Sequence, residues 1–563
     1  MHHAGGVVAA GGSLPAPSGN GSSIDLPSVI PASFLQVVDE PLPLPAPVNE
    51  TADDTLPPTM RDEDDLPPPA REIPVPKKVS DLPPPPATST VPGCDVDDRD
   101  EPLTLTEVLE SVRQHYPLLL AVERERGIAT GRLTSALGAF DTNVSAQGTS
   151  LAPGTYENYR SDLGLSQLLP TGGISVFGGY RTGFGDFPTY NLQQKTADAG
   201  EWRGGVTVPF ARGRDIDRAR ATRAQADLDI AMAEPTIERS RLDYMRMAAR
   251  AYWAWMGSGE RTGAADELVD LAIERDAELI LKVRGGTTAN IERVDNQQNI
   301  ALRQAVVVQA DRALQQSMID LSLFHRDPSG KPLLAGRRRL RPIARPVPPD
   351  PGLFETSLAR ALAVRPEFQR LSLQREKLVV DRRLAANTML PGVDGQILGN
   401  QDSGFGKSPL SGPNGLDRQV LQAQLVFQMP AQRRDARGKL QTIDSQIVQL
   451  DRQLQFTTDR VRAEVQDAYS ALERAYEFHK QSAQRLDLAQ LVARAEREQL
   501  RLGRSDVLRV TLREQAFFDA QILEITARQD YWRSDSDLRA ADTSLTPENS
   551  GPIAAPILDL RIP

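Results

Sequence analysis

The stretch Leu421-Gln-Ala-Gln-Leu-Val-Phe-Gln-Met429 alternates apolar and polar side chains, and a very long helical pattern begins directly after it. Such alternation is typical of a half-buried strand. From Ala431 to Leu502 the sequence has no proline and a single glycine, Gly438. At 1.5 Å per residue, roughly 70 helical residues make a helix on the order of 100 Å long. A strand that leads into a helix too long for a compact globular domain decides the fold.

This helical stretch carries an apolar seam with the three–four spacing of a coiled coil. It ends at Gly503, and a second stretch nearly free of helix breakers follows at 505–541. Two helices joined by a tight turn form an antiparallel hairpin. The residues of the seam are Val461, Val465, Ala468, Leu472 and Tyr476.

The same unit occurs earlier in the chain. Apolar residues and glycines alternate with more polar ones from Trp202 to Phe210, and a helical run follows over 211–284. This run is looser because of Pro235, Gly257, Gly259 and Gly263. This run ends at Gly285-Gly286, and a second helix is predicted over 289–324. The first half of the chain therefore also predicts a strand followed by a long helical hairpin.

The two halves also open alike. An amphipathic helix ends at Pro117 in the first half and at Pro366 in the second, and each is followed by a further helical run, over 118–137 and 367–388. Both runs then turn into Gly-rich sequence, near Asp141 and Pro391. A unit that recurs in the same order is an internal repeat. We therefore predict two structural repeats per chain.

Residues 1–100 differ in composition from the rest of the chain. They hold 20 of the 43 prolines, and their 16 acidic residues outnumber 5 Lys and Arg. Such a segment has too little apolar surface to fold. The acidity of the chain thus belongs to this segment and gives no support to nucleic-acid binding. The predicted organisation is a disordered extension over 1–100, a first repeat over 101–327, a linker over 328–352, a second repeat over 353–542 and a C-terminal tail over 543–563.

Signals for export and membrane attachment are sparse. The one cysteine, Cys94, excludes an internal disulfide framework. Val91-Pro-Gly-Cys94 loosely resembles a bacterial lipidation site but lacks a preceding apolar core, so a solvent-exposed cysteine is the alternative. Met1 to Asn20 shows no charged start followed by a compact apolar core, so we recognise no export signal. No apolar run reaches about 18 residues, and no transmembrane helix is predicted.

The chain offers four to six strands. These include an extra strand-like pair, 161–168 and 174–182, around Pro170-Thr-Gly-Gly173. Alternating strands occur in soluble sheets and in membrane barrels. A membrane barrel needs at least eight strands, and its edges cannot face lipid. A membrane location would therefore require several copies of the chain around a rotational axis.

Five further motifs follow one another along the two halves of the chain. They are Leu165-Ser-Gln-Leu-Leu-Pro-Thr-Gly-Gly173, Val206-Thr-Val-Pro-Phe210, Ala249-Arg-Ala-Tyr-Trp253, Val465-Gln-Asp-Ala-Tyr469 and Gly503-Arg-Ser-Asp-Val-Leu508. With the two helix openings, they make residues 103–542 similar to the outer-membrane efflux protein (TolC-like) family. The resemblance implies an α+β membrane protein, with a trimeric outer-membrane β-barrel continued by a long α-helical coiled-coil barrel in the periplasm.

The resemblance also implies a function. The chain would be one subunit of a passive exit duct for a tripartite efflux pump or a type I secretion system. Its partners would be two further copies, a periplasmic adaptor, an inner-membrane pump and outer-membrane lipid. The transported substrate stays open between small toxic molecules, metal ions and secreted protein. The basic family pattern has four strands per subunit, so the extra pair either enlarges the barrel or folds over its outer mouth.

In this family the turns after the long helices line the periplasmic entrance. They match Gly286 to Asp295 and Gly503 to Arg509. Asp506 matches an acidic residue of the second turn, where a ring of three carboxylates biases passage toward cations. Arg509 and Asn290 stand where the family commonly carries acidic residues, which weakens that prediction. The candidate entrance residues are Gly286, Asn290, Glu292, Arg293, Asp295, Gly503, Arg504, Asp506 and Arg509.

Charges in these turns have two interpretations. Glu292, Arg293, Asp295, Arg504 and Arg509 are candidates for gate salt bridges, with solvated charges on a helical hairpin as the alternative. The basic cluster Arg337-Arg-Arg-Leu-Arg341 is interpreted as a solvated loop, with contact to a partner or an anionic surface as its alternative.

Signals for catalysis are missing from the sequence. There is no phosphate-binding loop, no His-Glu-x-x-His pair and no Gly-x-Ser-x-Gly elbow. The five histidines are scattered, and His115 and His479 are interpreted as packing or surface residues. We predict no enzyme activity, no cofactor and no metal ligand. A soluble coiled-coil scaffold is the alternative function, although it does not account for the alternating strands.

Overall fold

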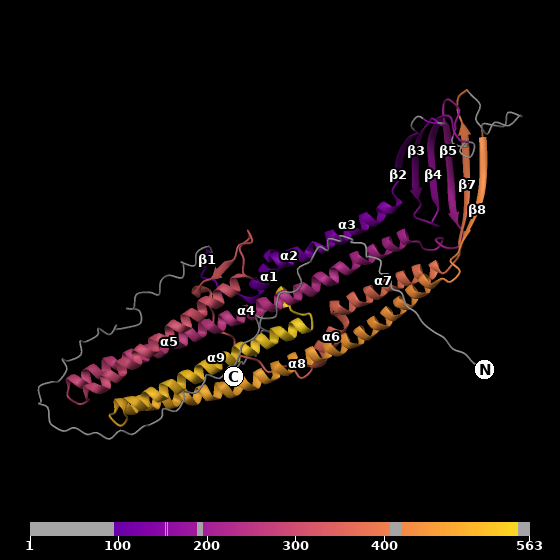
Figure 1. Ribbon diagram of the computed structural model, residues 1–563. Helices are drawn as coiled ribbons and strands as arrows, with labels where there is room; N and C mark the ends of the chain where they lie inside the picture. Colours follow the sequence, from indigo (N-terminus) through magenta and orange to yellow (C-terminus); the bar gives the residue numbers. More distant parts are fainter. Residues whose placement is uncertain (1–94, 152–153, 155, 189–194, 406–418, 550–563) are drawn as a thin grey trace, which may run out of the picture. The chain divides into compact units, whose positions relative to one another are not determined.

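The structure is a computed structural model that describes residues 95–151, 154, 156–188, 195–405 and 419–549 (Figure 1). Both predicted openings are helices, α1 (Leu105–His115) and α6 (Leu353–Val364). Each is followed by a helix with proline at its first position, α2 (Pro117–Glu123) and α7 (Pro366–Thr388). Proline is favoured there because the first N–H groups of a helix have no intrahelical partner. Helix α3 (Glu125–Leu137) and the 3-10 turn η4 (Gly138–Phe140) lead from α2 to the sheet.

Two long helical hairpins follow the strands, as the sequence predicted. The first is α4 (Arg218–Arg284) with α5 (Asn290–Ser322), and the second is α8 (Arg434–Arg501) with α9 (Val507–Ala541). Each turn contains a glycine at positive φ, Gly286 at 71° and Gly503 at 70°. Glycine adopts this conformation without steric cost, which allows the chain to reverse. Within the described part of the chain, no helix combines the length and the hydropathy that a membrane span requires.

The strands form a six-stranded antiparallel sheet with the order β2-β3-β4-β5-β7-β8 (Figure 1). The first half of the chain contributes four of these strands and the second half two. Strands β5 and β7 join the halves through pairs from Glu201↔Asp402 to Pro209↔Asp394. The strands are β2 (Asn143–Leu151), β3 (Asn158–Leu168), β4 (Ser175–Gly185), β5 (Glu201–Pro209), β7 (Gly392–Asp402) and β8 (Gln419–Gln428).

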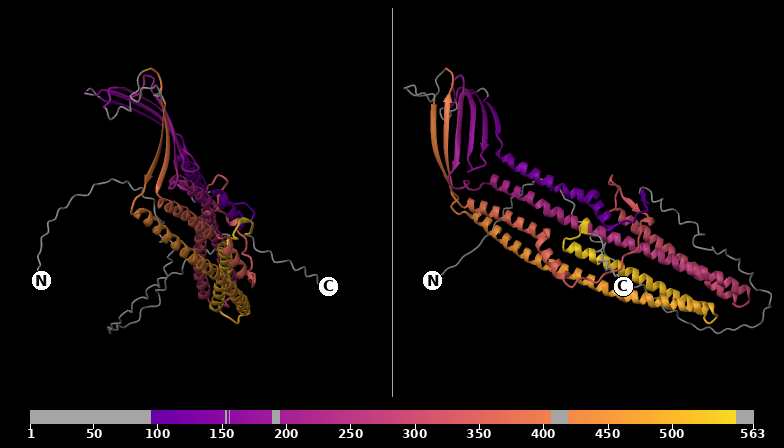
Figure 2. Two further views of the ribbon diagram at one scale, coloured as in Figure 1. Left: turned by 90° about the vertical axis from the view of Figure 1, so that its right-hand side faces the viewer. Right: turned by 180° about the vertical axis from the view of Figure 1, so that it is seen from behind.

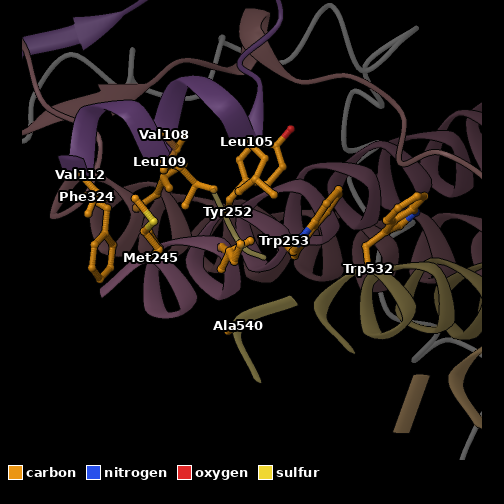
Figure 3. Packing of buried hydrophobic residues seen from close by; sticks show 14 of the residues in the cluster. Leu105, Val108, Leu109, Val112, Met245, Tyr252, Trp253, Phe324, Trp532 and Ala540 are labelled. Atoms are coloured by element: carbon orange, nitrogen blue, oxygen red, sulfur yellow. The ribbon is translucent and has the colours of Figure 1, made fainter. Parts of the chain in front are cut away.

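The main hydrophobic core lies among α1 and the helices of both long hairpins, away from the six-stranded sheet (Figure 3). The indole rings of Trp253 and Trp532 stack with centroids 5.7 Å apart. Tyr252 is fully buried, and its hydroxyl donates to the Leu103 carbonyl at 3.0 Å. A buried aromatic ring needs such a partner for its polar atom. This core fastens the opening helix α1 to both long hairpins.

Two segments without predicted regular structure pair with each other. Strand β1 (Asp95–Asp97), inside the predicted disordered extension, pairs in parallel with β6 (Leu333–Ala335), inside the predicted linker loop. The linker also contains a 3-10 turn, η6 (Arg337–Arg339), and a further turn, η7 (Pro547–Asn549), follows α9. Both predictions were therefore wrong for these residues, because local composition does not reveal a long-range strand pair. Predictions for residues 1–94, including Cys94, and for 550–563 lie outside the described residues.

The interpretation of Arg337–Arg341 as a solvated loop was wrong for Arg339. Its side chain is 1% exposed and pairs with Asp97 and Glu107. Burial alone would raise the pKa of Asp97, but hydrogen bonds from Arg99, His325 and Arg339 hold that pKa well below its usual range. Arg339 therefore fastens the start of the described chain to the linker.

The turn between β3 and β4 yields a first prediction. Gly172 and Gly173 both have φ of 67°, so alanine is strained at either position by roughly 1–2 kcal/mol. A Cβ at Gly173 would also lie 2.2 Å from the Gly213 carbonyl oxygen, whereas a Cβ at Gly172 meets only the Ile174 side chain at 3.5 Å. We expect Gly173→Ala to destabilise the protein by roughly 1–3 kcal/mol more than Gly172→Ala. Thermal unfolding of the two purified variants measures this difference, and equal melting temperatures would contradict it.

Candidate functional site

One face of the sheet is apolar across all six strands. The register places Leu163, Tyr180 and Trp202 directly opposite one another on β3, β4 and β5. On β8, Leu421 and Leu425 belong to the same face, opposite Gly399 and Gly395. Tyr180 is half-buried, and the other four side chains are exposed, Trp202 at 61% and Leu425 at 68%. Figure 2 shows no described helix lying over this sheet.

The opposite face carries every charged residue of these six strands. A direct cross-strand row runs from Asp162 through Arg181 and Glu201 to Asp402. The Arg203 guanidinium lies 2.9 Å from the Asp162 carboxylate, and Arg181 pairs with Glu201. Because side chains alternate along a strand, the register keeps every strand charge off the face that bears Leu163, Trp202 and Leu425. The charged residues of this face are Arg160, Asp162, Arg181, Glu201, Arg203, Asp394 and Asp402.

Aromatic side chains border the apolar face. Trp202 stands near the end of β5 that is distant from the helices, next to the Tyr180 ring at a centroid distance of 5.0 Å. Phe210, 53% exposed, follows β5 at the helical end. Eight residues at 3.3 Å each separate the two rings by roughly 26 Å. An apolar band about 25 Å tall between aromatic girdles is typical of outer-membrane strands.

The predicted entrance residues lie in and beside the two hairpin turns. Gly286 and Gly503 are the turn glycines, Asn290 is the first residue of α5, and Arg504 and Asp506 precede α9. The Asp506 carboxylate accepts a hydrogen bond from the Arg509 N–H at 2.8 Å and so caps α9. This cap is a structural role that the sequence reasoning did not assign to Asp506.

The predicted gate salt bridges are only partly present. Arg509 lies 3.4 Å from Asp506, and Arg293 lies 3.7 Å from the buried Asp276 of α4. Within the described residues, Glu292, Asp295 and Arg504 have no ion pair within 4 Å. Each pair forms within its own hairpin, and neither pair joins the two hairpins. The role of these residues in a gate therefore stays a prediction.

The tips of the two hairpins contact each other. Leu279 of α4 packs with Leu500 of α8 and with Val507 and Val510 of α9. The Lys282 ammonium group donates to the Leu500 carbonyl at 3.2 Å. These contacts bring the two predicted turns to one end of the helical part.

A buried ionic cluster lies farther from the turns. The Glu514 carboxylate, on α9, accepts from Arg275 of α4 at 2.8 Å and from Arg303 of α5 at 3.0 Å, both on the same oxygen. Arg275 also donates to the Asn296 side chain at 2.7 Å. The side chain of Arg275 is 5% exposed, that of Arg303 is 2% exposed and that of Glu514 is 1% exposed. Burial lowers the pKa of Arg303 despite the attraction of Glu514. The cluster therefore joins three helices with one carboxylate for two guanidinium groups.

A cavity of about 390 Å³ adjoins this cluster between α4, α8 and α9. Glu274 and Glu278 line it from α4, and Arg494 and Arg497 line it from α8. Unlike charges thus face each other across the gap between the two hairpins.

One group of side chains has the composition of a metal site. Ligand atoms of Asp97, Glu107 and His325 lie within 4.8 Å of one another. The guanidinium groups of Arg339 and Arg99 already neutralise both carboxylates. A metal cation would have to compete with these two fixed positive charges, so the donor set does not fit one.

Comparison with known proteins finds similar structures but no similar sequence. No protein-family model matches the sequence, and no curated protein is significantly similar to it. The open state of the Neisseria gonorrhoeae MtrE outer membrane channel matches with a TM-score of 0.57 and 13% identity, covering 80% of this chain and 94% of that one. The Campylobacter jejuni CmeC outer membrane channel matches with a TM-score of 0.55 and 12% identity, covering 78% and 86%. The Vibrio cholerae outer membrane protein VceC matches with a TM-score of 0.55 and 14% identity, covering 78% and 95%.

The fold is that of the TolC-like outer-membrane channels. Sequence reasoning found the strands and hairpin turns of this TolC-like fold but missed its buried ionic cluster. A signal was present in α9, where the buried positions Val507, Val510, Glu514 and Phe517 follow a three–four spacing. A glutamate on an apolar helix seam predicts a buried partner. The partners themselves, on α4 and α5, could be found only from the TolC-like fold.

Proposed function

We propose that the chain is one subunit of a homotrimeric channel in the bacterial outer membrane. Strands of the three subunits close a barrel in the membrane, and the hairpins continue it as a helical barrel in the periplasm. The channel is a passive exit duct of a tripartite efflux pump or a type I secretion system and catalyses no reaction. A periplasmic adaptor and an inner-membrane pump dock at the hairpin end, where the turns at Gly286 and Gly503 form the entrance.

The separation of charge on the sheet carries this proposal. A charged side chain facing lipid near the bilayer centre costs roughly 2–4 kcal/mol. The strands keep all their charges, such as Asp162 and Arg181, off the face that bears Leu163 and Leu425. The apolar face fits lipid and the charged face fits a water-filled pore.

The sheet edges support an assembly of several copies. In the described sheet β2 and β8 are the outer strands, and neither contains proline or a charged residue. Soluble proteins usually protect sheet edges with such residues. Six antiparallel strands are also fewer than the eight that close the smallest membrane barrel. Because β2 and β8 run in opposite directions, β8 of one copy can pair in antiparallel fashion with β2 of the next.

The alternative function, a soluble coiled-coil scaffold, is not favoured. It would leave Leu163, Trp202 and Leu425 in water on one continuous apolar face. Monomeric soluble proteins rarely expose large contiguous apolar patches. The scaffold also assigns no role to the charged row on the opposite face.

Cell fractionation of the full chain tests the proposal. We expect the protein in the outer-membrane fraction, as a detergent-resistant oligomer with three times the mass of the chain. Recovery in the soluble fraction without such an oligomer would overturn the channel and favour the scaffold.

Asp506 offers a second prediction, on ion passage through the entrance. Alanine would remove both the charge and the cap of α9, whereas asparagine keeps a capping oxygen and removes only the charge. We expect Asp506→Asn to lower cation preference and single-channel conductance while the oligomer assembles normally. The effect should be clear at 0.01 M salt, where the Debye length is about 30 Å, and nearly absent at 1 M, where it is about 3 Å.

Planar-bilayer recordings of the wild type and of Asp506→Asn at 0.01 M and 1 M salt measure the change in cation preference and conductance. Arg504→Gln in the same turn is the matched control and should shift cation preference in the opposite direction. Recordings of Asp506→Asn that equal the wild type at low salt would show that Asp506 does not face the ion path.

A further inference from the structure

The first half of the chain contains a hairpin that the second half lacks. In the second half β7 and β8 follow each other directly between α7 and α8, whereas in the first half β3 and β4 stand between β2 and β5. We infer that this hairpin, β3–β4, is part of the membrane wall, so that three chains build an eighteen-stranded barrel. This inference rests on the proposed trimeric channel. An eighteen-stranded pore admits larger solutes than a twelve-stranded one.

The hairpin is paired with a neighbouring strand on each side, over most of β3 and over the helical half of β4. Strand β3 pairs with β2 from Asn143↔Ser166 to Leu151↔Asn158, and β4 pairs with β5 from Ser175↔Thr207 to Arg181↔Glu201. A hairpin that folded over the mouth of the barrel would leave β2 and β5 to pair with each other. The described ladder has the four strands in one continuous sheet instead.

The side chains of the hairpin follow the two faces of the sheet. Leu163 and Tyr180 lie on the apolar face in line with Trp202, and Asp162 and Arg181 lie on the charged face in line with Glu201. A segment folded over the mouth would contact water on both sides and would have no need for this alternation. The hairpin therefore has the polarity of a strand pair between lipid and a pore.

The β3–β4 turn is fixed at the helical end of the sheet. Gly173 lies against the Gly213 carbonyl, in the segment that precedes α4. The Gln167 side chain donates to the Phe140 carbonyl of η4 at 3.1 Å. Because the turn is held at the helical end, both strands cross the full height of the sheet and cannot hinge over the opposite mouth.

Barrel diameter grows roughly linearly with strand number. Eighteen strands give a barrel about 1.5 times as wide as twelve, with about 2.3 times the cross-section. Eighteen-stranded barrels leave an open aqueous channel. The paired charges of the hairpin, Asp162 with Arg203 and Arg181 with Glu201, then lie on the wall of this wide pore.

Thiol labelling of the full chain tests the position of the hairpin. In a Cys94→Ser background, Leu165→Cys places a thiol on the apolar face of β3 and Ser166→Cys places one on the charged face. Val206→Cys and Thr207→Cys on β5 are the matched controls. We expect fluorophores at 165 and 206 to be quenched from the lipid phase, and thiols at 166 and 207 to react with a membrane-impermeant reagent.

Equal aqueous reaction at 165 and 166, with the normal alternation at 206 and 207, would overturn the inference but leave the channel intact. An image of the wild-type trimer gives a second readout, with eighteen wall strands expected. Twelve wall strands would also overturn the inference alone. Failure to form any membrane-bound trimer would overturn it together with the proposed function.

Solute size provides a third readout. Deleting residues 156–196 joins β2 to β5 on the side of the sheet away from the helices and leaves four strands per chain. We expect polymers added from the outer side to enter the wild-type barrel up to a diameter about 1.5 times that admitted by the deletion variant. An equal size limit in two variants that both form trimers would show that the hairpin does not widen the pore.

Discussion

Replacing Leu425 with arginine is expected to remove the protein from the outer membrane, whereas the same change at Gln424 leaves it there. The two residues are neighbours on β8, but Leu425 belongs to the apolar face and Gln424 to the charged face. Arginine on the lipid side costs roughly 2–4 kcal/mol at the bilayer midplane and less toward the interfaces. Leu425 lies within the apolar band, at the level of Val208. A trimer has this free-energy cost three times, once in each subunit. Arginine at position 424 has no such cost, because it faces a water-filled pore.

The amount of heat-resistant oligomer in the outer-membrane fraction measures the outcome. We expect little or none for Leu425→Arg and a near-normal amount for Gln424→Arg. Both residues are exposed in the single chain, so a loss of monomer stability is not expected to separate them. If both variants assembled equally well, the apolar face of the sheet would not face lipid.

Replacing Glu514 with glutamine is expected to loosen the contact between the two helical hairpins. Two buried guanidinium groups, of Arg275 and Arg303, share the buried Glu514 carboxylate. Removing one partner of a buried ionic cluster typically costs about 3–5 kcal/mol, because the remaining charges stay buried without compensation. Amide hydrogens of α5 near Arg303 should then exchange at least about 100-fold faster, since each 1.4 kcal/mol is a factor of ten.

Hydrogen exchange of the purified trimer measures this loss. Glu498→Gln is the matched control, because Glu498 forms an exposed pair with Arg501 on α8, worth about 0.2–1 kcal/mol. Adding Arg303→Met to Glu514→Gln should restore part of the protection by removing one stranded charge. Equal exchange in Glu514→Gln and the wild type would show that Glu514 does not hold the hairpins together.

Local patterns made much of the fold predictable. The helix that ends at Gly503 was found because no residue before it breaks the apolar period and because glycine permits the reversal. The strand after Trp202 was found because side chains alternate in a strand. The hydrogen bond that makes Asp506 a helix cap also has a local signal, since aspartate three residues before the paired N–H is a common cap.

The remaining features depend on partners distant in the sequence. Strand β6 lies in the Pro-rich linker and forms only because β1 pairs with it. Arg339 lies in a basic run that looks solvated, and its burial depends on Asp97 and Glu107. Glu514 stands on an apolar seam, but Arg275 and Arg303 reach it from another hairpin.

By itself, the sequence determined the period of each segment and hence the strands, the long hairpins and their duplication, because period and turn residues act over a few positions. Only the tertiary structure decided which strands are neighbours. It placed β5 beside β7, nearly 200 residues apart, and it set β3 and β4 between β2 and β5. Register then put all the strand charges on one face, because neighbouring strands share a face only when their pairing is fixed.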